Sequence, residues 1–133
     1  MTLPVSGAGY QIGDGNTEVQ LRIQAAPATA IDTATLTAAQ LLNGIILATP
    51  TAAAAYTLPL GTAMDTAVGN AKINSYFDFY VINLASSNYD ITMTTNTGWT
   101  LTGGGVAVVQ ELSSAHFRAR KTDVGTWSLY RLS

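Results

Sequence analysis

The chain has 133 residues, no cysteine and only one histidine. Without cysteine it has no disulfide bonds and no thiolate chemistry. A zinc site would have to be built from carboxylates and one imidazole, which is not the usual donor set. We therefore expect no metal centre and no cofactor.

No apolar run approaches the roughly 20 residues that span a bilayer, and residues 1–10 do not resemble a signal peptide, so we expect no membrane partner.

Charge is also scarce. Charged residues make up 11% of the chain, which is under half of the roughly 25% of an average soluble domain. Six basic residues and a net charge of −2 cannot supply the phosphate neutralisation that drives nucleic-acid binding. We therefore exclude nucleic acid as a partner.

Small neutral residues are abundant instead. The chain contains 20 alanines, 19 threonines and 12 glycines, and hydrophobic residues make up 47% of it. A chain of this length and composition is expected to form one domain with a core of its own. A surface covered by small neutral groups repels its neighbours weakly, and it suits a protein whose faces are covered by other subunits.

The N-terminal region is expected to form an arm and a first strand, residues 1–24, in front of a β-sandwich domain, residues 25–133. Glycines and Pro4 punctuate residues 1–16, in which Tyr10 and Ile12 are the main large anchors. Residues 17–24 alternate strictly between apolar and polar side chains, which predicts a half-buried strand. The apolar residues of this strand are Val19, Leu21 and Ile23.

The rest of the chain alternates short apolar runs with Gly, Pro or Asn breaks. The strongest strand signal is 76–82, which is interrupted only by Asp78 and is expected to be covered on both faces. Further strands are expected at 45–48, 54–58, 88–94, 98–101, 106–109, 115–120 and 127–132. Two short helices are expected, one capped by Thr37 and closed by Asn43-Gly44, and one over 62–68. This pattern, without a long helix, predicts an all-β sandwich or barrel and not a parallel α/β fold.

A near-repeat, TAIDTA at 29–34 and TAMDTA at 62–67, is the best enzymatic lead. Asp-Thr-Ala after an apolar residue resembles the catalytic triplet of aspartic proteases, in which two carboxylates share one proton. However, an aspartate or threonine beside alanines is also an ordinary helix-start signal. We therefore keep an aspartic protease as a minor hypothesis and expect no enzyme. The near-repeat does not recur a third time, so we expect no solenoid.

The single histidine, His116, alternates with Arg118 and Arg120 on one side of an expected strand. As a general base it would need an orienting carboxylate and a nucleophile nearby. The simpler interpretation is a solvated or interfacial strand face. The tryptophans and tyrosines could line a sugar platform, but aromatic residues spread along a chain are more often core or interface anchors.

Several short sequence motifs from Thr37 onward follow one another in a way that is typical of one group of proteins. They are TAAQLLNGII at 37–46, YTLP at 56–59, an aromatic strand ending in VIN at 81–83, GWTL at 98–101 and GTWSLY at 125–130. In this succession of motifs the chain resembles the small jelly-roll proteins of tailed-phage particles, which are the decoration (cement) proteins and fibre-head domains. The resemblance implies a jelly-roll-like antiparallel β-sandwich that forms homotrimers on the capsid shell and has no catalytic residues.

On this basis we expect a capsid decoration protein on the outer capsid surface of the virion, with other copies of itself and the major capsid protein as partners. The alternative is a receptor- or glycan-binding tip domain of a tail fibre. The residues expected to dock on the capsid or a partner are Tyr10, Ile12, Val19, Leu21 and Ile23; equally, the last three could complete the domain's own sandwich. The residues expected in the core or at a subunit interface are Tyr76, Phe77, Phe79, Phe117 and Trp127.

Overall fold

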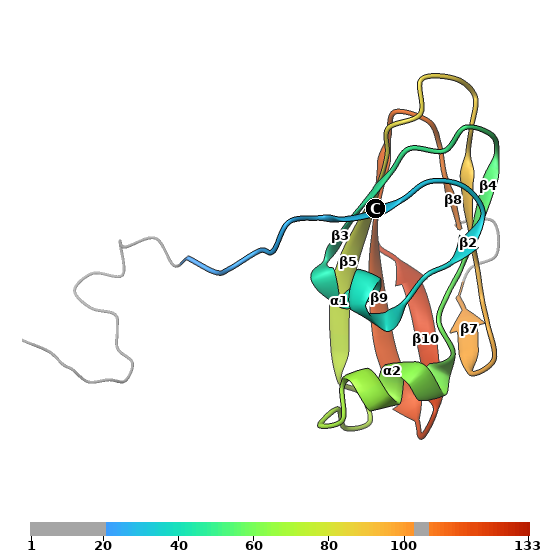
Figure 1. Ribbon diagram of the computed structural model, residues 1–133. Coiled ribbons are helices and arrows are strands. Elements are labelled where there is room, and N and C mark those ends of the chain that lie inside the picture. The colour runs from blue at the N-terminus through green and yellow to red at the C-terminus, as the bar shows by residue number, and fades with distance from the viewer. Residues whose placement is uncertain (1–20, 103–106) are drawn as a thin grey trace, which may run out of the picture.

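The computed structural model describes residues 21–102 and 107–133, which form a mainly β protein with two sheets and two short helices (Figure 1). The large sheet contains, in spatial order, β1 (Ala28–Ala30), β3 (Ile45–Ala48), β5 (Tyr76–Asn83), β9 (Ser114–Asp123), β10 (Thr126–Arg131) and β7 (Trp99–Leu101). The small sheet contains β2 (Ala34–Thr35), β4 (Ala54–Thr57), β6 (Ile91–Thr94) and β8 (Val108–Val109). The helices are α1 (Ala38–Asn43) and α2 (Gly61–Ala67).

The first half of the chain passes back and forth between the two sheets. β1, β3 and β5 are parallel neighbours in the large sheet, and β2, β4 and β6 are parallel neighbours in the small sheet. The chain therefore winds three times around the core, which the sequence analysis does not predict. The near-repeat does not mark these turns, because residues 29–34 span the β1–β2 connection whereas residues 62–67 lie in α2.

The C-terminal strands are mostly antiparallel. β9 pairs antiparallel with β5 on one side and with β10 on the other, and β8 pairs antiparallel with β6. The expected antiparallel sandwich is thus correct for these strands and wrong for β1–β3–β5 and β2–β4–β6. The reason is the connection, because a strand that is followed by a crossing to the other sheet can return in the same direction, which a tight hairpin does not allow.

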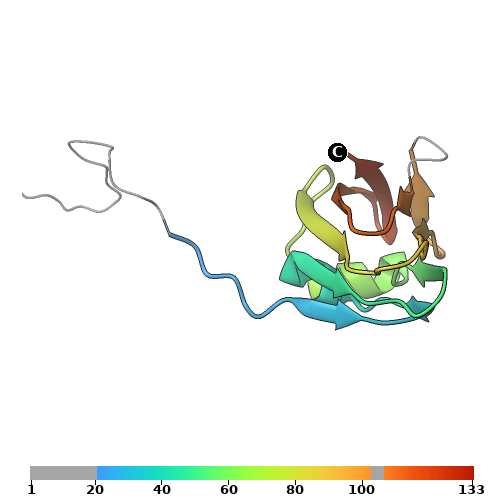
Figure 2. The ribbon, with the colours of Figure 1, turned by 90° about the horizontal axis from the view of Figure 1, so that it is seen from above.

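Both sheets contribute to one hydrophobic core, which they enclose when the molecule is seen from above (Figure 2). The largest fully buried side chains are Trp127, Tyr56, Phe79, Phe117, Leu36, Leu41, Ile46, Leu58, Met64, Ile91, Leu129 and Val81. Full burial of one such large apolar side chain stabilises the fold by about 1.5–3 kcal/mol. The core therefore accounts for the inner face of the large sheet and leaves its outer face free for another role.

The helix α1 begins and ends where the sequence predicts. The Thr37 hydroxyl accepts a hydrogen bond from the Gln40 amide at 3.2 Å, and the Gln40 side-chain oxygen accepts one from the Thr37 amide at 2.9 Å. This reciprocal pair is a capping box. The helix ends at Gly44, whose φ of 96° is the left-handed conformation that favours glycine. Gln40 also donates to the Thr29 carbonyl at 2.9 Å, so the side chain that caps α1 also binds β1.

Three glycines allow α2 to contact the turns below the large sheet. A Cβ atom on Gly61, the first residue of α2, would lie 2.2 Å from the Gly125 carbonyl oxygen. A Cβ atom on Gly98, just before β7, would lie 2.4 Å from the same oxygen. Only glycine permits such close backbone approach. This packing places α2, and with it Asp65, beside the β9–β10 turn.

Most expected strands and both helices are confirmed, with boundaries that differ by a few residues. The expected strand at 17–24 is wrong within the described residues, because residues 21–27 form no strand. An alternating pattern forms a strand only where a neighbour accepts its backbone hydrogen bonds. At the nearest edge, the Thr29 carbonyl of β1 is already bound by Gln40. The sequence analysis also missed β1 and β2, since Pro27 and the alanines around it indicate a break.

Candidate functional site

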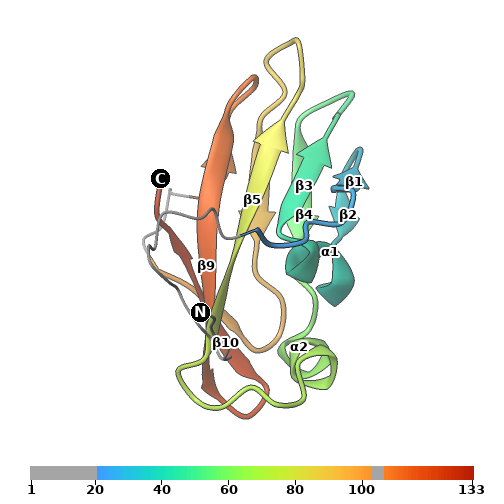
Figure 3. The same ribbon diagram turned by 90° about the vertical axis from the view of Figure 1, so that its left-hand side faces the viewer.

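The outer face of the large sheet carries the densest group of polar and aromatic side chains outside the core. Figure 3 shows β3, β5 and β9 with this face toward the viewer. Alternate residues point outward because successive side chains of a strand lie on opposite faces. We define the outer face as Ile45 and Leu47 of β3, Tyr76, Asp78, Tyr80 and Ile82 of β5, Ser114, His116, Arg118 and Arg120 of β9, and Tyr130 of β10.

Asp78 is the centre of a charge cluster on this face. Its carboxylate accepts hydrogen bonds from Arg118 Nε at 2.7 Å and from Arg118 Nη2 at 3.0 Å. His116 Nε2 lies 2.8 Å from the same carboxylate. The guanidinium of Arg118, with a smaller contribution from His116, lowers the pKa of Asp78 below its ordinary value, and Asp78 in turn raises the pKa of Arg118. The aspartate is therefore held as a carboxylate that orients both neighbours.

Exposed tyrosines lie over His116 and Arg118. The Tyr80 ring stacks on His116 at 4.3 Å between ring centroids, and the Arg118 guanidinium lies 4.0 Å from the centre of the Tyr76 ring. Tyr76 is 58% exposed and Tyr80 is 44% exposed. The described part of the chain leaves the outer face of β5 partly exposed, so cover on both faces of this strand would need a partner and stays a prediction. Tyrosine counts as apolar in a sequence pattern, yet its hydroxyl allows one end to stay in water.

Arg120 differs from Arg118 in its partners. Its guanidinium donates to the Tyr130 hydroxyl at 3.0 and 2.8 Å and to the Asn74 side-chain oxygen at 2.7 Å. Both partners are neutral. Among the described residues, the side-chain ion pairs join Asp78 to Arg118 and Asp65 to Lys121. Arg120 is thus positioned by neutral groups and has no carboxylate in the part of the chain that the structure describes.

The sequence analysis predicts that His116, Arg118 and Arg120 share one face of a strand, but not which residues of other strands they contact. The alternation of His116, Arg118 and Arg120 against a buried side of β9 is confirmed. His116 has a carboxylate beside it, Asp78, but within residues 21–102 and 107–133 no hydroxyl or thiol nucleophile bonds to its ring. Asp78 could not be assigned to this cluster from sequence, since the pairing of β5 with β9 brings together residues 38 positions apart.

A second aspartate, Asp65, forms hydrogen bonds on the inner side of the large sheet. Asp65 of α2 accepts hydrogen bonds from Lys121 Nζ at 2.5 Å, from the Gly125 amide at 2.5 Å and from Trp127 Nε1 at 3.0 Å. Lys121 is only 8% exposed. The hydrogen bond from Lys121 is the main cause that lowers the pKa of Asp65. This cluster joins α2 to the β9–β10 turn.

The two Asp-Thr-Ala copies do not form a carboxylate dyad. Asp32 accepts hydrogen bonds from the Thr51 amide at 2.8 Å and from the Thr51 hydroxyl at 2.9 Å. It shares no hydrogen-bond partner with Asp65 among the described residues. The protease hypothesis therefore loses its structural basis.

The described part of the expected docking element leads away from the body (Figures 1 and 2). Leu21 is 88% exposed and Ile23 is 100% exposed. They do not complete the protein's own sandwich, so that alternative is wrong for these two residues. The other expected docking residues, Tyr10, Ile12 and Val19, lie outside the described residues. The docking role itself stays a prediction.

The five aromatic residues expected in the core or at an interface divide between the two faces. Phe79, Phe117 and Trp127 are buried. Phe77 is partly buried and packs edge-on against Trp127, with 5.9 Å between ring centroids. Tyr76 lies on the outer face.

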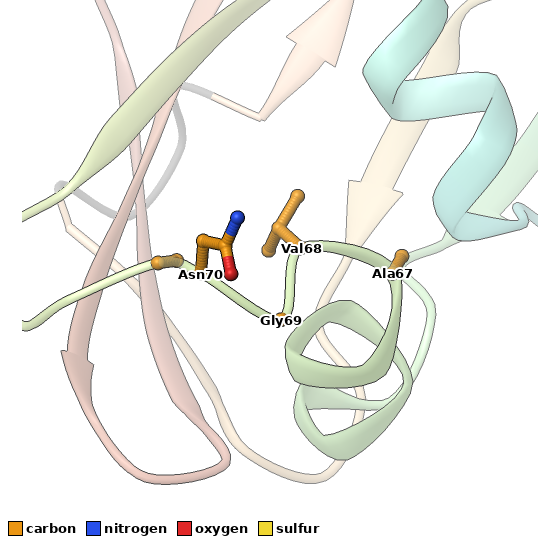
Figure 4. Close-up of a pocket in the computed structure, with 5 residues that line it drawn as sticks. Ala67, Val68, Gly69 and Asn70 are labelled. Carbon is orange, nitrogen blue, oxygen red and sulfur yellow. The ribbon is translucent and has the colours of Figure 1, made fainter.

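The remaining features offer little chemistry. A shallow pocket after α2 is lined by Ala67, Val68, Gly69, Asn70 and Ala71 (Figure 4). Asn70 is its one polar side chain. Within residues 21–102 and 107–133, no three His, Asp or Glu side chains are grouped so that they could bind a metal. No helix in that part is long and apolar enough to cross a bilayer.

Comparison of the chain with protein-family models, with curated proteins and with solved structures finds no match.

Proposed function

We propose that this protein is a non-enzymatic structural protein of a tailed-phage virion. It binds the outside of the capsid shell as a homotrimer and contacts the major capsid protein. The observation that carries this proposal is the exposed stem at residues 21–27, which extends from the body with Leu21 and Ile23 uncovered. Large apolar side chains in this state are stabilised only when a partner covers them.

The distribution of other apolar side chains supports a subunit within an assembly. Large apolar side chains are exposed at many places on a chain that has few charges to balance them. They include Ile31, Leu60, Ile73, Leu84, Leu112 and Leu132. Single exposed apolar residues are ordinary, but this number on a weakly charged domain favours a surface that other subunits cover.

The jelly-roll-like assignment belongs to this proposal. The antiparallel block β5–β9–β10 agrees with it, and the parallel neighbours β1–β3–β5 depart from it. The resemblance of residues 37–131 to decoration and fibre-head proteins adds the trimeric state. Sedimentation of the purified protein should give three times the 13.9 kDa of one chain. A clean monomer at micromolar concentration contradicts the trimer.

Shell binding is tested with capsids of the phage that encodes the chain, stripped of this protein. The full chain should bind them, and the double variant Leu21→Ser/Ile23→Ser should bind markedly less, with an unchanged melting temperature. Val124→Ser is the matched control, because Val124 is also exposed but lies on the β9–β10 turn. Deleting residues 1–16 should weaken binding while the protein stays folded, because the deletion removes Tyr10 and Ile12 but keeps Leu21 and Ile23. Equal binding by the truncated and full chains would contradict a docking role for the arm.

The second candidate function is a receptor- or glycan-binding tip domain of a tail fibre. It is favoured by the outer face, where the exposed rings of Tyr76 and Tyr80 lie beside hydrogen-bonding Arg and His side chains. Tyrosine and arginine are common in binding surfaces of this kind. The two functions separate in one pair of assays, since a decoration protein binds shells and no sugars, whereas a tip domain binds a glycan and no shells.

A further inference from the structure

The outer face changes character along its strands. At one end, cross-strand pairs combine an aromatic or acidic residue of β5 with a basic residue of β9: Tyr76 with Arg120, Asp78 with Arg118 and Tyr80 with His116. At the other end, Ile82 of β5 lies beside Leu47 of β3. Successive pairs are about 6.8 Å apart along the strands. The face is therefore graded. At one end Arg118 and His116 bind the carboxylate of Asp78 and Arg120 has only neutral partners among the described residues, whereas the other end carries Ile82 and Leu47.

The sequence of the N-terminal arm has the same gradient with the opposite charge. Its even-numbered residues are Tyr10, Ile12, Asp14, Asn16 and Glu18. In an extended chain these side chains share one face and repeat at the same spacing of about 6.8 Å. The two apolar residues lead, and the two acidic residues follow. Residues 10–18 contain no Lys or Arg.

We propose that residues 10–18 of one copy bind the outer face of a neighbouring copy. Glu18 lies opposite Arg120, the cation that has only neutral partners among the described residues. Two pairs further along, Asp14 lies opposite Tyr80 and His116. Ile12 then covers the apolar end at Ile82 and Leu47. Each end of the arm meets the end of the face that complements it.

The stem at residues 21–27 explains why the partner is another copy. It leaves the body on the side on which the outer face lies and extends away from it (Figures 1 and 3). Docking on the protein's own face would require the chain to reverse immediately before Leu21. A chain of nine residues, the number from 19 to 27, spans up to about 30 Å when it is extended, which is enough to reach an adjacent subunit.

This inference rests on the proposed homo-oligomer and divides the arm into two sides. The even-numbered residues 10–18 bind a neighbouring copy. The odd-numbered Val19, Leu21 and Ile23 remain free for the shell. Because the test below uses purified protein without shells, it can fail while shell binding succeeds, and the reverse.

The absence of cysteine from the chain makes disulfide trapping a direct test. In the double variant Glu18→Cys/Arg120→Cys, an arm docked on a neighbour should produce covalent oligomers on a non-reducing gel. A docked arm holds the two thiols at an effective concentration on the order of 1 mM, so at about 10 μM protein the cross-link should form roughly a hundredfold faster than by collision. The control for collision is Glu18→Cys/Val124→Cys, whose second cysteine is on the exposed β9–β10 turn.

A second pair checks the register and guards against misfolding. Asp14→Cys/Tyr80→Cys should also form covalent oligomers, and it leaves Arg120 and its partners intact. The variants with a single cysteine measure how much cross-linking forms between the same position in two copies. A thermal melt of each reduced variant verifies the fold.

Two results overturn the proposal. Monomers with an internal disulfide would show that the arm binds its own outer face. Cross-linking of both pairs at the rate of the Val124 control would show that the arm binds elsewhere.

Discussion

The two faces of the large sheet contain the same kinds of side chain in very different surroundings. Inside, Trp127 and Phe77 pack beside the Asp65–Lys121 ion pair. Outside, Tyr80 stacks beside the Asp78–His116–Arg118 cluster. Both faces have an aspartate, its cations and aromatic rings. The two carboxylates are similarly exposed, at 21% for Asp65 and 27% for Asp78, but Lys121 is 10% exposed whereas Arg118 is 37% exposed. Because the inner cation is the more deeply buried, we expect the inner cluster to maintain the fold and the outer one to remain available for a partner.

The largest difference between the faces is expected from their aromatic residues. Trp127→Ala removes a side chain that packs against Phe77 and Trp99 and donates to Asp65. The free energy of unfolding should fall by about 3–5 kcal/mol, which is a large share of the roughly 5–15 kcal/mol of a whole domain. Tyr80→Ala on the outer face should cost under about 1 kcal/mol. Urea denaturation measures both values.

Trp127→Phe is the matched control for this first comparison. It keeps an aromatic ring in the core but removes the hydrogen bond to Asp65, so it should lie between Trp127→Ala and the parent protein. If Tyr80→Ala destabilised the isolated protein as much as Trp127→Ala, the distinction between a structural and an available face would be wrong.

The next largest difference is expected from the two aspartates. Asp65→Asn leaves Lys121 as a largely buried cation without its carboxylate, and the free energy of unfolding should fall by about 2–4 kcal/mol. Asp78→Asn acts on a partly exposed cluster, and its effect should stay under about 1 kcal/mol. The melting temperatures of the two variants at neutral pH measure this difference. Equal losses would mean that the outer cluster also maintains the fold.

The sequence predicted the inner face better than the outer one. Local patterns are enough for Thr37 as a helix cap, Gly44 as a helix end and the alternation of Ala115, Phe117 and Ala119, because each depends on residues nearby in the chain. The aspartate clusters depend on strand pairing and helix packing over 38–62 positions, which no local pattern contains. Asp65 could be found only as part of a misleading near-repeat.

The winding of the chain was missed for a related reason. β1 and β2 are short and rich in alanine and threonine, so their side chains give no strand signal. Their place in the sheets comes from parallel pairing with β3 and β4. The segment 17–24 is the opposite case, with a strong strand pattern but no strand in its described part. An alternating pattern therefore shows that a segment can form a strand. Whether it forms one within its own subunit depends on whether a sheet edge is available to pair with it.

The smallest expected difference is in the response to acid. Both aspartates have a pKa below the ordinary value of 3.8 in the folded protein. A carboxyl whose pKa is lowered by folding stabilises the folded state above its unfolded pKa, and this stabilisation is lost as the pH falls through the lowered value. The parent protein should therefore lose stability progressively below about pH 4.

In Asp65→Asn this decline should be shallower than in the parent, because one of the two contributing groups no longer titrates. Asp78→Asn should also flatten the decline, and by less, since Arg118 is more exposed to water than Lys121 and its ion pair is screened more strongly. Asp123→Asn, at the exposed C-terminal end of β9, controls for the loss of one negative charge. Urea denaturation across this pH range measures each slope. A parent-like decline in Asp65→Asn would show that the inner ion pair does not contribute to acid stability, and the inner and outer clusters would then be equivalent in this respect.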